Sequence, residues 1–302
     1  MPKALLTDRR RDSYIVRRDA SPVRSVPKEY VHLHEAGSVL VANWSALGGG
    51  RYAVTANWPD GGVFAGSVPL LLTQTIRQST LLIGHAELGV PLAHQTLMEW
   101  MDFSVAGDFY DPKNKPDNLF IILTFKPNNP RSLRVELSIL SEGRLVAESL
   151  LDFSWIAPGA YRRLRGEHAQ VAWDAITAPS PVAAHTVGRA HAGEVVLAPT
   201  PLPDRWELRT DVSRSALYDH RVDHVPGLAL IEAAYQAAHA MTGPGHEPVR
   251  VMNTFDRYVE FDAPCWIDAE VVPNPDEDIV RVEVTGTQNG ERTFAVTMDC
   301  PR

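Results

Sequence analysis

Polar residues interrupt two long apolar segments of the chain in the same way. The first, residues 69–78, reads Pro-Leu-Leu-Leu-Thr-Gln-Thr-Ile-Arg-Gln, and the second, residues 227–236, reads Gly-Leu-Ala-Leu-Ile-Glu-Ala-Ala-Tyr-Gln. Each carries a polar residue and, three positions later, a second functional side chain, which places both on one face of a helix. The pattern predicts two buried helices 158 positions apart (69 and 227), and therefore two copies of one domain in a single chain.

Strand-like alternation follows each predicted helix. After a helix over residues 70–88, apolar and polar positions alternate in four stretches separated by Pro, Asn and Gly: 97–110, 119–126, 132–140 and 144–155. After a second helix over residues 228–241, the same pattern predicts strands at 249–260, 265–273, 278–286 and 291–299, with Asn289-Gly290 as a hairpin signal between the last two. A buried helix followed by an antiparallel meander, occurring twice, indicates an α+β fold.

The repeated order also predicts the domain organisation. Residues 1–29 carry alternating charges and are expected to form an N-terminal arm. The two repeats are expected at residues 30–160 and 205–302, and the proline-rich residues 161–204 are expected to link them. An active site is expected where the two copies meet.

Composition narrows the class of protein. An apolar content of 44% and a charged content of 22% are typical of a soluble globular protein. The net charge of −8 disfavours nucleic-acid binding, and no apolar run reaches the roughly 18 residues that cross a membrane. The N-terminus lacks the apolar core of a secretory signal, and Cys265 and Cys300 are too few for a disulfide framework. We therefore expect a cytoplasmic protein without nucleic-acid or membrane partners, and the sequence indicates no cofactor.

One basic cluster departs from the acidic balance. Arg162, Arg163 and Arg165 lie within the sequence Tyr-Arg-Arg-Leu-Arg. Such a cluster is typical of a solvated linker, and it also fits a docking patch for an acidic partner. Both interpretations remain open at this point.

The richest chemistry precedes the second predicted helix. Two histidines and two aspartates crowd the loop that enters it: Asp219, His220, Asp223 and His224. Pro226 and Gly227 then fix the entry, and the free N–H groups of a helix start suit an acyl carbonyl or a phosphate. Capping or core histidines are the alternative. A His-x-x-Asp-His loop also fits zinc, but no further ligand cluster appears in the sequence, so no metal is expected.

The polar residues of the two helices differ in kind. Glu232 lies inside an apolar helix, where desolvation of an unpaired carboxylate would raise its pKa toward the range of an acid or base. In the first copy Gln74 takes its place, and Arg77 aligns with Tyr235. A buried Arg77 needs an anionic partner, either a structural carboxylate or a substrate phosphate.

Three blocks of sequence resemble the A-factor biosynthesis (AfsA-type) family of tandem hotdog proteins. They are Ile76-Arg77-Gln78, Gly89-Val90-Pro91-Leu92-Ala93-His94-Gln95 and Asp219-His220-x-x-Asp223-His224-Val225-Pro226-Gly227. The resemblance covers roughly residues 30–300 and implies a double hotdog fold, in which a curved antiparallel sheet wraps each long buried helix and the two copies form an internal pseudo-dimer. Whether the chain also forms a homodimer is left open.

The resemblance also implies an activity. Enzymes of this family are γ-butyrolactone or furan autoinducer synthases, which transfer a β-ketoacyl group from acyl carrier protein to the hydroxyl of dihydroxyacetone phosphate. The Glu/Arg pairs of the family's helices fall on Gln74 and Arg77 in the first copy and on Glu232 and Tyr235 in the second, so each helix keeps one member. Glu232 and Arg77 then either meet in one composite site or belong to two separate sites.

On this basis the expected site is assigned residue by residue. Glu232 or His220 is expected to deprotonate the acceptor, the N–H groups at Gly227 to hold the oxyanion, and Arg77 to bind the phosphate. The remaining residues expected to bind substrate are Asp223, His224, Gln74 and Tyr235, and the basic cluster Arg162, Arg163 and Arg165 is the expected contact for the acyl carrier protein. A wider similarity to hotdog dehydratases leaves a dehydratase, hydratase or thioesterase on carrier-bound chains as an alternative. A non-catalytic acyl-binding module is the third possibility.

Overall fold

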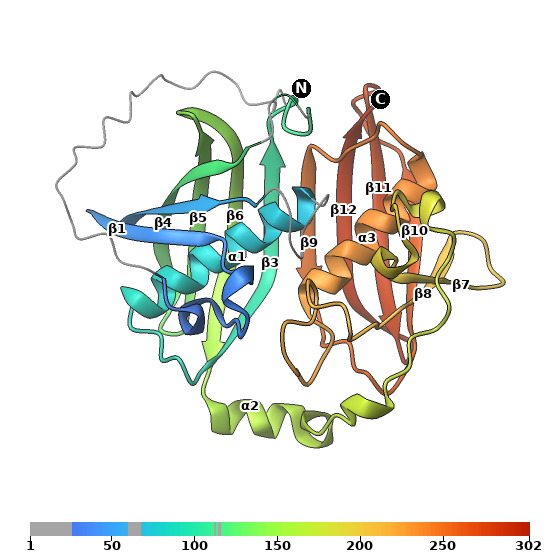
Figure 1. Ribbon diagram of the computed structural model, residues 1–302, viewed down its shortest axis with the longest axis horizontal. Helices are drawn as coiled ribbons and strands as arrows, with labels where there is room; N and C mark the ends of the chain where they lie inside the picture. Colours follow the sequence, from blue (N-terminus) through green and yellow to red (C-terminus); the bar gives the residue numbers. More distant parts are fainter. Residues whose placement is uncertain (1–25, 60–67, 112, 114–115) are drawn as a thin grey trace.

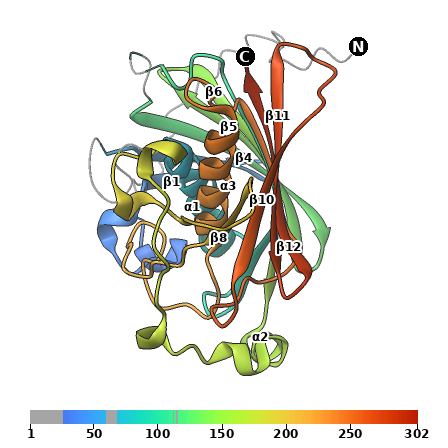
Figure 2. The same cartoon turned by 90° about the vertical axis from the view of Figure 1, so that its right-hand side faces the viewer.

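The computed structural model describes residues 26–59, 68–111, 113 and 116–302. Two long helices, α1 (Val68–Ala86) and α3 (Gly227–Thr242), lie next to each other on one face of a single large antiparallel sheet (Figure 1 and Figure 2). A short helix, α2 (Pro158–Arg165), lies in the segment that connects the two halves of the molecule (Figure 1). Most of the predicted N-terminal arm, residues 1–29, lies outside the described residues.

The sheet is symmetric in its strand order. The first half contributes β1 (Val41–Gly48), β2 (Arg51–Asn57), β3 (Gln95–Val105), β4 (Asn118–Asn129), β5 (Ser132–Ser141) and β6 (Arg144–Ile156). The second half contributes β7 (Leu197–Pro199), β8 (Arg205–Leu208), β9 (Arg250–Phe255), β10 (Cys265–Val272), β11 (Ile279–Gln288) and β12 (Glu291–Pro301). The order is β1-β2-β4-β5-β6-β3-β9-β12-β11-β10-β8-β7, so the halves mirror each other about the antiparallel β3–β9 pair. This arrangement confirms the predicted duplication.

Period-two burial explains why these segments form strands on one side of two helices. In β5, Val135, Leu137 and Ile139 are buried, whereas the intervening Arg134 and Glu136 face solvent. Each such apolar side chain contributes about 1.5–3 kcal/mol relative to an exposed one. Helix α1 is buried almost all round, which is why its apolar residues recur too closely for a single stripe.

Two glutamines prove the register of the repeat. The Gln78 side chain accepts the N–H of Leu40 and donates to the carbonyl of Ser38, at 2.7 and 2.9 Å. Gln236 accepts the N–H of Val196 at 2.9 Å and donates to the carbonyl of Glu194 at 2.8 Å. The helices therefore align 158 positions apart (78 and 236), and the segments they anchor align 156 apart (40 and 196).

The short 3-10 turns before the first strand of each half follow the same spacing. They are η1 (Lys28–Val31) and η2 (Ala36–Ser38) in the first half, and η6 (Ala184–Val187) and η7 (Ala192–Glu194) in the second. His32 and Gly188, which end η1 and η6, both have left-handed backbone conformations. Residues 26–40 and 182–196 are thus equivalent segments that pack along α1 and α3, respectively.

The interval between the repeats contains more structure than its prolines indicate. Besides α2 it holds the 3-10 turns η4 (Gly166–Ala169) and η5 (Trp173–Ala175), and its strand β7 pairs with β8. The predicted hairpin between β11 and β12 is confirmed, since Asn289 (φ 53°) and Gly290 (φ 80°) adopt the left-handed conformations of a tight two-residue turn. None of the helices in the described part of the chain is long and apolar enough to cross a membrane.

Candidate active site

The loop before α3 is attached to the opposite half of the molecule through Asp219. Its carboxylate accepts the backbone N–H groups of His34 at 2.6 Å and Glu35 at 3.1 Å, which lie between η1 and η2. Burial opposes the ionisation of Asp219, but the hydrogen bonds from His34 and His220 outweigh it and hold its pKa below the usual value. The loop before α3, which carries Asp219 and His220, therefore contacts the first half of the molecule.

His220 is oriented by this carboxylate. Its Nδ1 lies 3.1 Å from Oδ2 of Asp219, and its ring stacks on that of His34 with centroids 4.3 Å apart. Because an ionised carboxylate only accepts, Nδ1 carries the proton, and a neutral His220 has a free lone pair on Nε2. An Asp–His pair of this form is the arrangement of a general base held by an orienting group.

Arg77 of α1 is a largely buried cation close to this pair. Its Nη1 donates to the carbonyl of Val31 at 3.3 Å, and among the described residues no carboxylate lies within ion-pair distance of it. Burial lowers its pKa to about 10, while the charge of Asp219 acts in the opposite direction. A guanidinium that is desolvated but not paired is suited to bind an anionic ligand.

Two neutral histidines complete the surroundings of Arg77. Nδ1 of His85 lies 2.8 Å from the carbonyl of Val90, and its Nε2 lies 2.9 Å from Nε2 of His32. Burial, followed by the charges of Arg77, His85 and His220, lowers the pKa of His32 to about 3. A carbonyl only accepts, so His85 donates from Nδ1, His32 donates from Nε2, and Nδ1 of His32 keeps its lone pair. Sequence reasoning missed His32 and His34, and no local pattern marks them.

Glu232 of α3 belongs to a different cluster. It is fully buried and forms a bidentate ion pair with Arg189, with Nε–Oε1 at 2.9 Å and Nη2–Oε2 at 3.1 Å. Arg214 lies 3.6 Å away, and Gln236 donates to Oε1 at 2.7 Å. Glu232 is therefore a paired carboxylate, because the interval between the repeats and the loop after β8 each supply an arginine.

The sequence left open whether Glu232 and Arg77 meet in one composite site or belong to two separate sites. Arg77 and Asp219, which orients His220, contact the same short segment: Arg77 donates to the carbonyl of Val31, and Asp219 accepts the N–H groups of His34 and Glu35. Within the part of the chain that the structure describes, no hydrogen bond or ion pair joins Glu232 to either of them. Arg77 and Glu232 thus occupy separate polar clusters on neighbouring helices.

Asp223 and His224 form a second Asp–His pair in the same loop. Nδ1 of His224 lies 2.7 Å from Oδ1 of Asp223. The Asp223 carboxylate also accepts from two residues of α2, with Oδ1 bonded to Tyr161 and Oδ2 to Arg165. Burial opposes ionisation of Asp223, but the hydrogen bonds from His224 and Tyr161 and the charge of Arg165 lower its pKa to about 2. His224 also packs against the ring of Tyr258, with centroids 4.5 Å apart.

Arg165 is not part of a surface patch. Its side chain is only 3% exposed, and its guanidinium is occupied by Asp223 and by a bidentate pair with Glu260 at 2.6 Å. The prediction that it contacts an acidic partner is therefore wrong. Arg162 and Arg163, on the same helix, are exposed.

The other predicted substrate-binding residues lie on or at the start of the two helices. Gly227 begins α3 after the extended Pro226, with no side chain capping the helix. A Cβ at Gly227 would lie 3.4 Å from the Phe255 ring, which is an ordinary packing contact. Gln74 is buried and its Oε1 has no partner among the described residues, while Tyr235 is buried beside Tyr110 of the first half.

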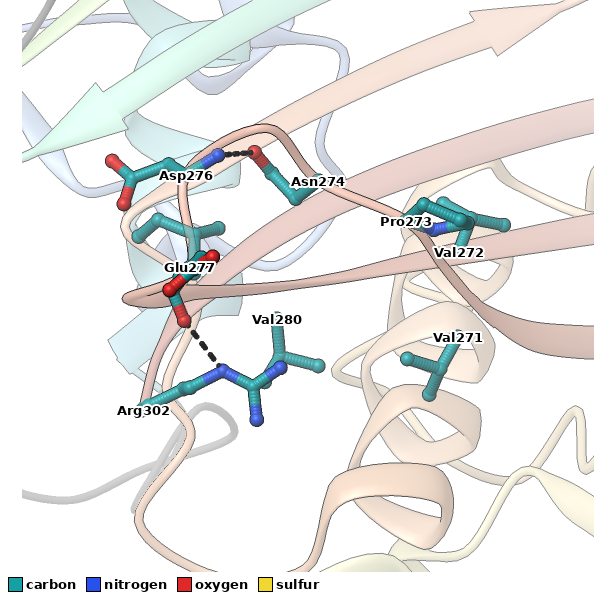
Figure 3. A pocket seen from close by; sticks show the side chains of 9 residues that line it. Val271, Val272, Pro273, Asn274, Asp276, Glu277, Val280 and Arg302 are labelled. Atoms are coloured by element: carbon teal, nitrogen blue, oxygen red, sulfur yellow. Dashed lines mark hydrogen bonds between the residues drawn. The ribbon is translucent and has the colours of Figure 1, made fainter.

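Two further observations concern possible metal ligands and the position of a surface hollow. The described residues contain no group of three or more His, Cys, Asp or Glu side chains placed to hold a metal ion. The hollow shown in Figure 3 lies between the β10–β11 hairpin and the C-terminal Arg302, with Val271, Val280 and Glu277 on its walls. None of the residues of the clusters around Arg77 or Glu232 lines it, so it is separate from the candidate site.

Two long helices covered by one mirror-symmetric antiparallel sheet define a double hotdog protein, and solved structures support this fold. The chain is similar to the 12:0-ACP thioesterase from Umbellularia californica, with a TM-score of 0.51 and 11% identity over 85% of this chain and 100% of that chain. It is also similar to an acyl-ACP thioesterase from Bacteroides thetaiotaomicron, with a TM-score of 0.51 and 12% identity over 83% of this chain and 97% of that chain.

The sequence comparisons define the family. The model of the A-factor biosynthesis hotdog domain matches residues 16–157 and 173–300, and the chain belongs to this family. It is 34% identical to the 2-oxo-3-(phosphooxy)propyl 3-oxoalkanoate synthase of Streptomyces coelicolor over 100% of this chain and 99% of that protein. It is 36% identical to the synthase of the same name from Streptomyces griseus over 94% of this chain and 98% of that protein. The predicted resemblance is confirmed.

Proposed function

We propose that the protein transfers a 3-oxoacyl group from an acyl carrier protein thioester to the hydroxyl of dihydroxyacetone phosphate. The name shared by the relatives describes an ester of a 3-oxoalkanoic acid with this phosphorylated three-carbon alcohol. The chain aligns with them over nearly its whole length, and the solved structures with the same fold include thioesterases that act on carrier-bound acyl groups. Such a product belongs to the biosynthesis of a γ-butyrolactone-type signal in the cytoplasm.

One observation carries the proposal: Arg77, a largely buried arginine with no ion-pair partner among the described residues, contacts the same segment, residues 31–35, that anchors the Asp219–His220 pair. Arg77 provides a desolvated cation for the phosphate of the acceptor. His220, held by Asp219, provides a base close to that anion site. A phosphorylated alcohol has the two groups that this arrangement recognises, an anion and a hydroxyl.

The proposed transfer needs no groups other than these residues and the two substrates. The acceptor hydroxyl gives its proton to Nε2 of His220, and its oxygen attacks the thioester carbonyl carbon. The N–H groups at the Gly227 start of α3 stabilise the oxyanion. The C–S bond then breaks, and the proton passes from His220 to the departing thiolate, which leaves an ester and a free carrier thiol.

The remaining predicted residues take supporting parts in this proposal. His224 and Asp223 lie at the entrance to α3, next to the oxyanion position. Gln74 and Tyr235 are buried on the two helices, and in this proposal they contact the acyl chain. Glu232 holds residues 182–196 against α3 through Arg189, so its contribution to catalysis is through the fold.

The acyl carrier protein is proposed to dock on the exposed side of α2. Arg162 and Arg163 are exposed there, whereas Arg165 on the same helix faces inward. Exposed arginines attract an acidic carrier and raise its association rate. Arg162→Glu combined with Arg163→Glu is expected to raise KM for the carrier substrate and to leave kcat unchanged.

The direct test is a two-substrate reaction. The protein is incubated with 3-oxoacyl carrier proteins of several chain lengths and dihydroxyacetone phosphate, and mass spectrometry follows the phosphorylated ester. Unphosphorylated dihydroxyacetone is the control for Arg77, and His220→Asn is the control for the base. Release of free 3-oxo acid at the same rate with and without acceptor would assign the protein as a thioesterase and overturn the proposal.

A further inference from the structure

The segment between the repeats forms hydrogen bonds to the loop before α3, residues 218–227, which carries both Asp–His pairs. Arg165 donates to both carboxylate oxygens of Glu260 at 2.6 Å, to the Asp223 carboxylate at 3.1 Å and to the Asp223 backbone carbonyl at 2.6 Å. Its guanidinium also lies 4.4 Å from the centre of the Tyr258 ring. The planar fork of an arginine makes these contacts at once, and the single ammonium of a lysine does not.

Tyr161 extends this contact to a histidine. Its hydroxyl lies 2.8 and 2.9 Å from the two carboxylate oxygens of Asp223, and Nδ1 of His224 lies 2.7 Å from the first of them. Tyr161 donates, the carboxylate accepts, and His224 donates from Nδ1, so that a neutral His224 carries its lone pair on Nε2. The same orienting chain that Asp219 forms for His220 is thus built a second time, from a different part of the molecule.

A third side chain from this segment reaches the loop backbone. Nε1 of Trp173 donates to the carbonyl of Val222 at 3.0 Å, and the Trp173 ring contacts Tyr218 with centroids 6.2 Å apart. The loop from Tyr218 to Gly227 therefore has α2 and its continuation on one side, while residues 34–35 of the first half hold it through Asp219 on the other. A connection that only spanned the two repeats would not need a buried arginine paired with two carboxylates, because burying these charges costs more than leaving them in water.

We infer that Tyr161 and Arg165 are positioning residues of the acyl transfer site. They fix Asp223, and through it they set the tautomer of His224 and the place of the whole loop that carries His220 into the site beside Arg77. The segment from Pro158 to Ala175 is then a working part of the site, not only a tether. The inference deepens the proposed function and rests on it for its kinetic part alone, because the tautomer of His224 can be observed in the protein without substrate.

The structural test uses histidine nitrogen spectra. In protein labelled with 15N at histidine, two-bond proton–nitrogen correlations report which ring nitrogen of His224 carries the proton, with His224→Gln identifying its signals. The wild-type protein is expected to show Nδ1–H and a bare Nε2. Tyr161→Phe and Arg165→Lys are expected to shift His224 toward a mixture of tautomers. An unchanged His224 tautomer in both variants would overturn the inference, whether or not acyl transfer is observed.

The kinetic test separates positioning from folding. Tyr161→Phe keeps the ring, and we expect it to lower kcat by ~10-fold while KM for the acceptor changes little, because a small displacement of a reacting group already costs this much. Arg165→Lys is expected to lower kcat by ~100-fold for the same reason. Equal losses of folded protein and of activity, with kcat per folded molecule unchanged, would also overturn the inference.

Matched controls make the same chemical changes elsewhere. Arg205 of β8 forms a similar bidentate pair with Asp268 at 2.6 and 2.9 Å, but away from the loop. Tyr52 of β2 has a hydroxyl without a hydrogen-bond partner among the described residues. Arg205→Lys and Tyr52→Phe are expected to leave kcat and the His224 signals unchanged. A wild-type protein that shows the ordered tautomer but no acyl transfer would refute the proposed function and leave the positioning intact.

Discussion

Helices α1 and α3 occupy equivalent places in the two halves, yet their polar residues do different work. Both keep a glutamine, Gln78 or Gln236, that binds the backbone of the segment packed alongside. One residue earlier, α1 has Arg77, which has no ion-pair partner among the described residues, where α3 has the buried Tyr235. The glutamines belong to the fold, whereas the positions around them have diverged.

The divergence extends to the segments that face the helices. Gln74 of α1 corresponds to Glu232 of α3, and Leu33, at the spacing of 156 that relates the facing segments, corresponds to Arg189. An uncharged residue therefore faces an apolar one in the first half, and a carboxylate faces an arginine in the second. In the second half Arg189 pairs with Glu232 inside the protein, whereas Arg77 in the first half has no ion-pair partner among the described residues and is proposed to bind the anionic substrate.

Glu232 is the place where the comparison predicts the largest effect. Glu232→Gln removes the carboxylate that neutralises Arg189 and Arg214 and leaves them with only the backbone carbonyls of Gly188 and Glu194 as acceptors, so we expect a loss of about 3–5 kcal/mol in the free energy of unfolding. Urea denaturation measures it. The double variant Glu232→Gln, Arg189→Leu installs the pair of the first half and is expected to recover part of this loss. Full stability of the single variant with loss of catalysis would instead make Glu232 a catalytic group.

Arg77→Met tests the other half. Because the cation is desolvated and has no ion-pair partner among the described residues, its removal is expected to keep or raise the thermal midpoint. The value of kcat/KM for dihydroxyacetone phosphate is expected to fall by ~100-fold, since the variant loses the charged hydrogen bonds to the phosphate. A variant with a lower thermal midpoint but an unchanged activity per folded molecule would assign Arg77 to the fold. The contrast between the two helices would then disappear.

The two glutamines should behave alike, because they make the same two backbone hydrogen bonds. Gln78→Leu and Gln236→Leu each leave a buried N–H and a buried carbonyl unsatisfied, which costs about 1–3 kcal/mol. Gln236→Leu is expected to cost slightly more, because Gln236 also donates to Glu232 at 2.7 Å. Urea denaturation midpoints measure the stability of the two variants. A loss of stability in only one of them would show that the two glutamines, although placed alike, do not contribute equally to the fold.

The smallest expected effect is the contribution of His32, in the first half, to the pH dependence of stability. His32 has a pKa of about 3 in the folded protein, lowered first by burial and then by Arg77, His85 and His220. Between pH 6.5, the usual value for histidine, and pH 3, the unfolded chain binds a proton that the folded protein does not, so stability falls as the pH falls through this window. Replacing His32 by Phe is expected to flatten the change in urea midpoint between pH 6.5 and pH 4.5, whereas replacing the exposed His185 by Gln is not.

Much of the fold could be predicted from local patterns. The two apolar segments, the strands after them and the Asn289-Gly290 turn all carry signals within a few residues, and the spacing of Gln78 and Gln236 gave the register of the repeat. Helix α1 begins at Val68 and ends at Ala86, within two residues of the predicted ends. These features depend on neighbours in sequence, which is why periodicity detects them.

The partners of the polar residues could not be predicted in the same way. Asp219 binds a backbone N–H 185 positions away, and Glu232 meets an arginine 43 positions away in an interval that looks like a loop. Arg165 lies among other arginines in sequence but points inward, because Glu260 and Asp223 are brought to it by the fold. Such pairings arise only after the chain has folded, so the sequence indicated polar and titratable residues as candidates but not which of them meet.

The two halves that meet at the β3–β9 pair are parts of one polypeptide, and this has a consequence for how the protein could change over time. In a dimer of identical chains, symmetry forces every substitution to appear twice, so a gain in one site brings the same change to the other. In a fused pair each position of the sequence occurs in only one half, so a substitution changes that half alone. An arginine could enter one helix and a glutamate with its own arginine could enter the other, independently. The covalent link between the repeats is therefore what permits one half to specialise while the other keeps the scaffold intact.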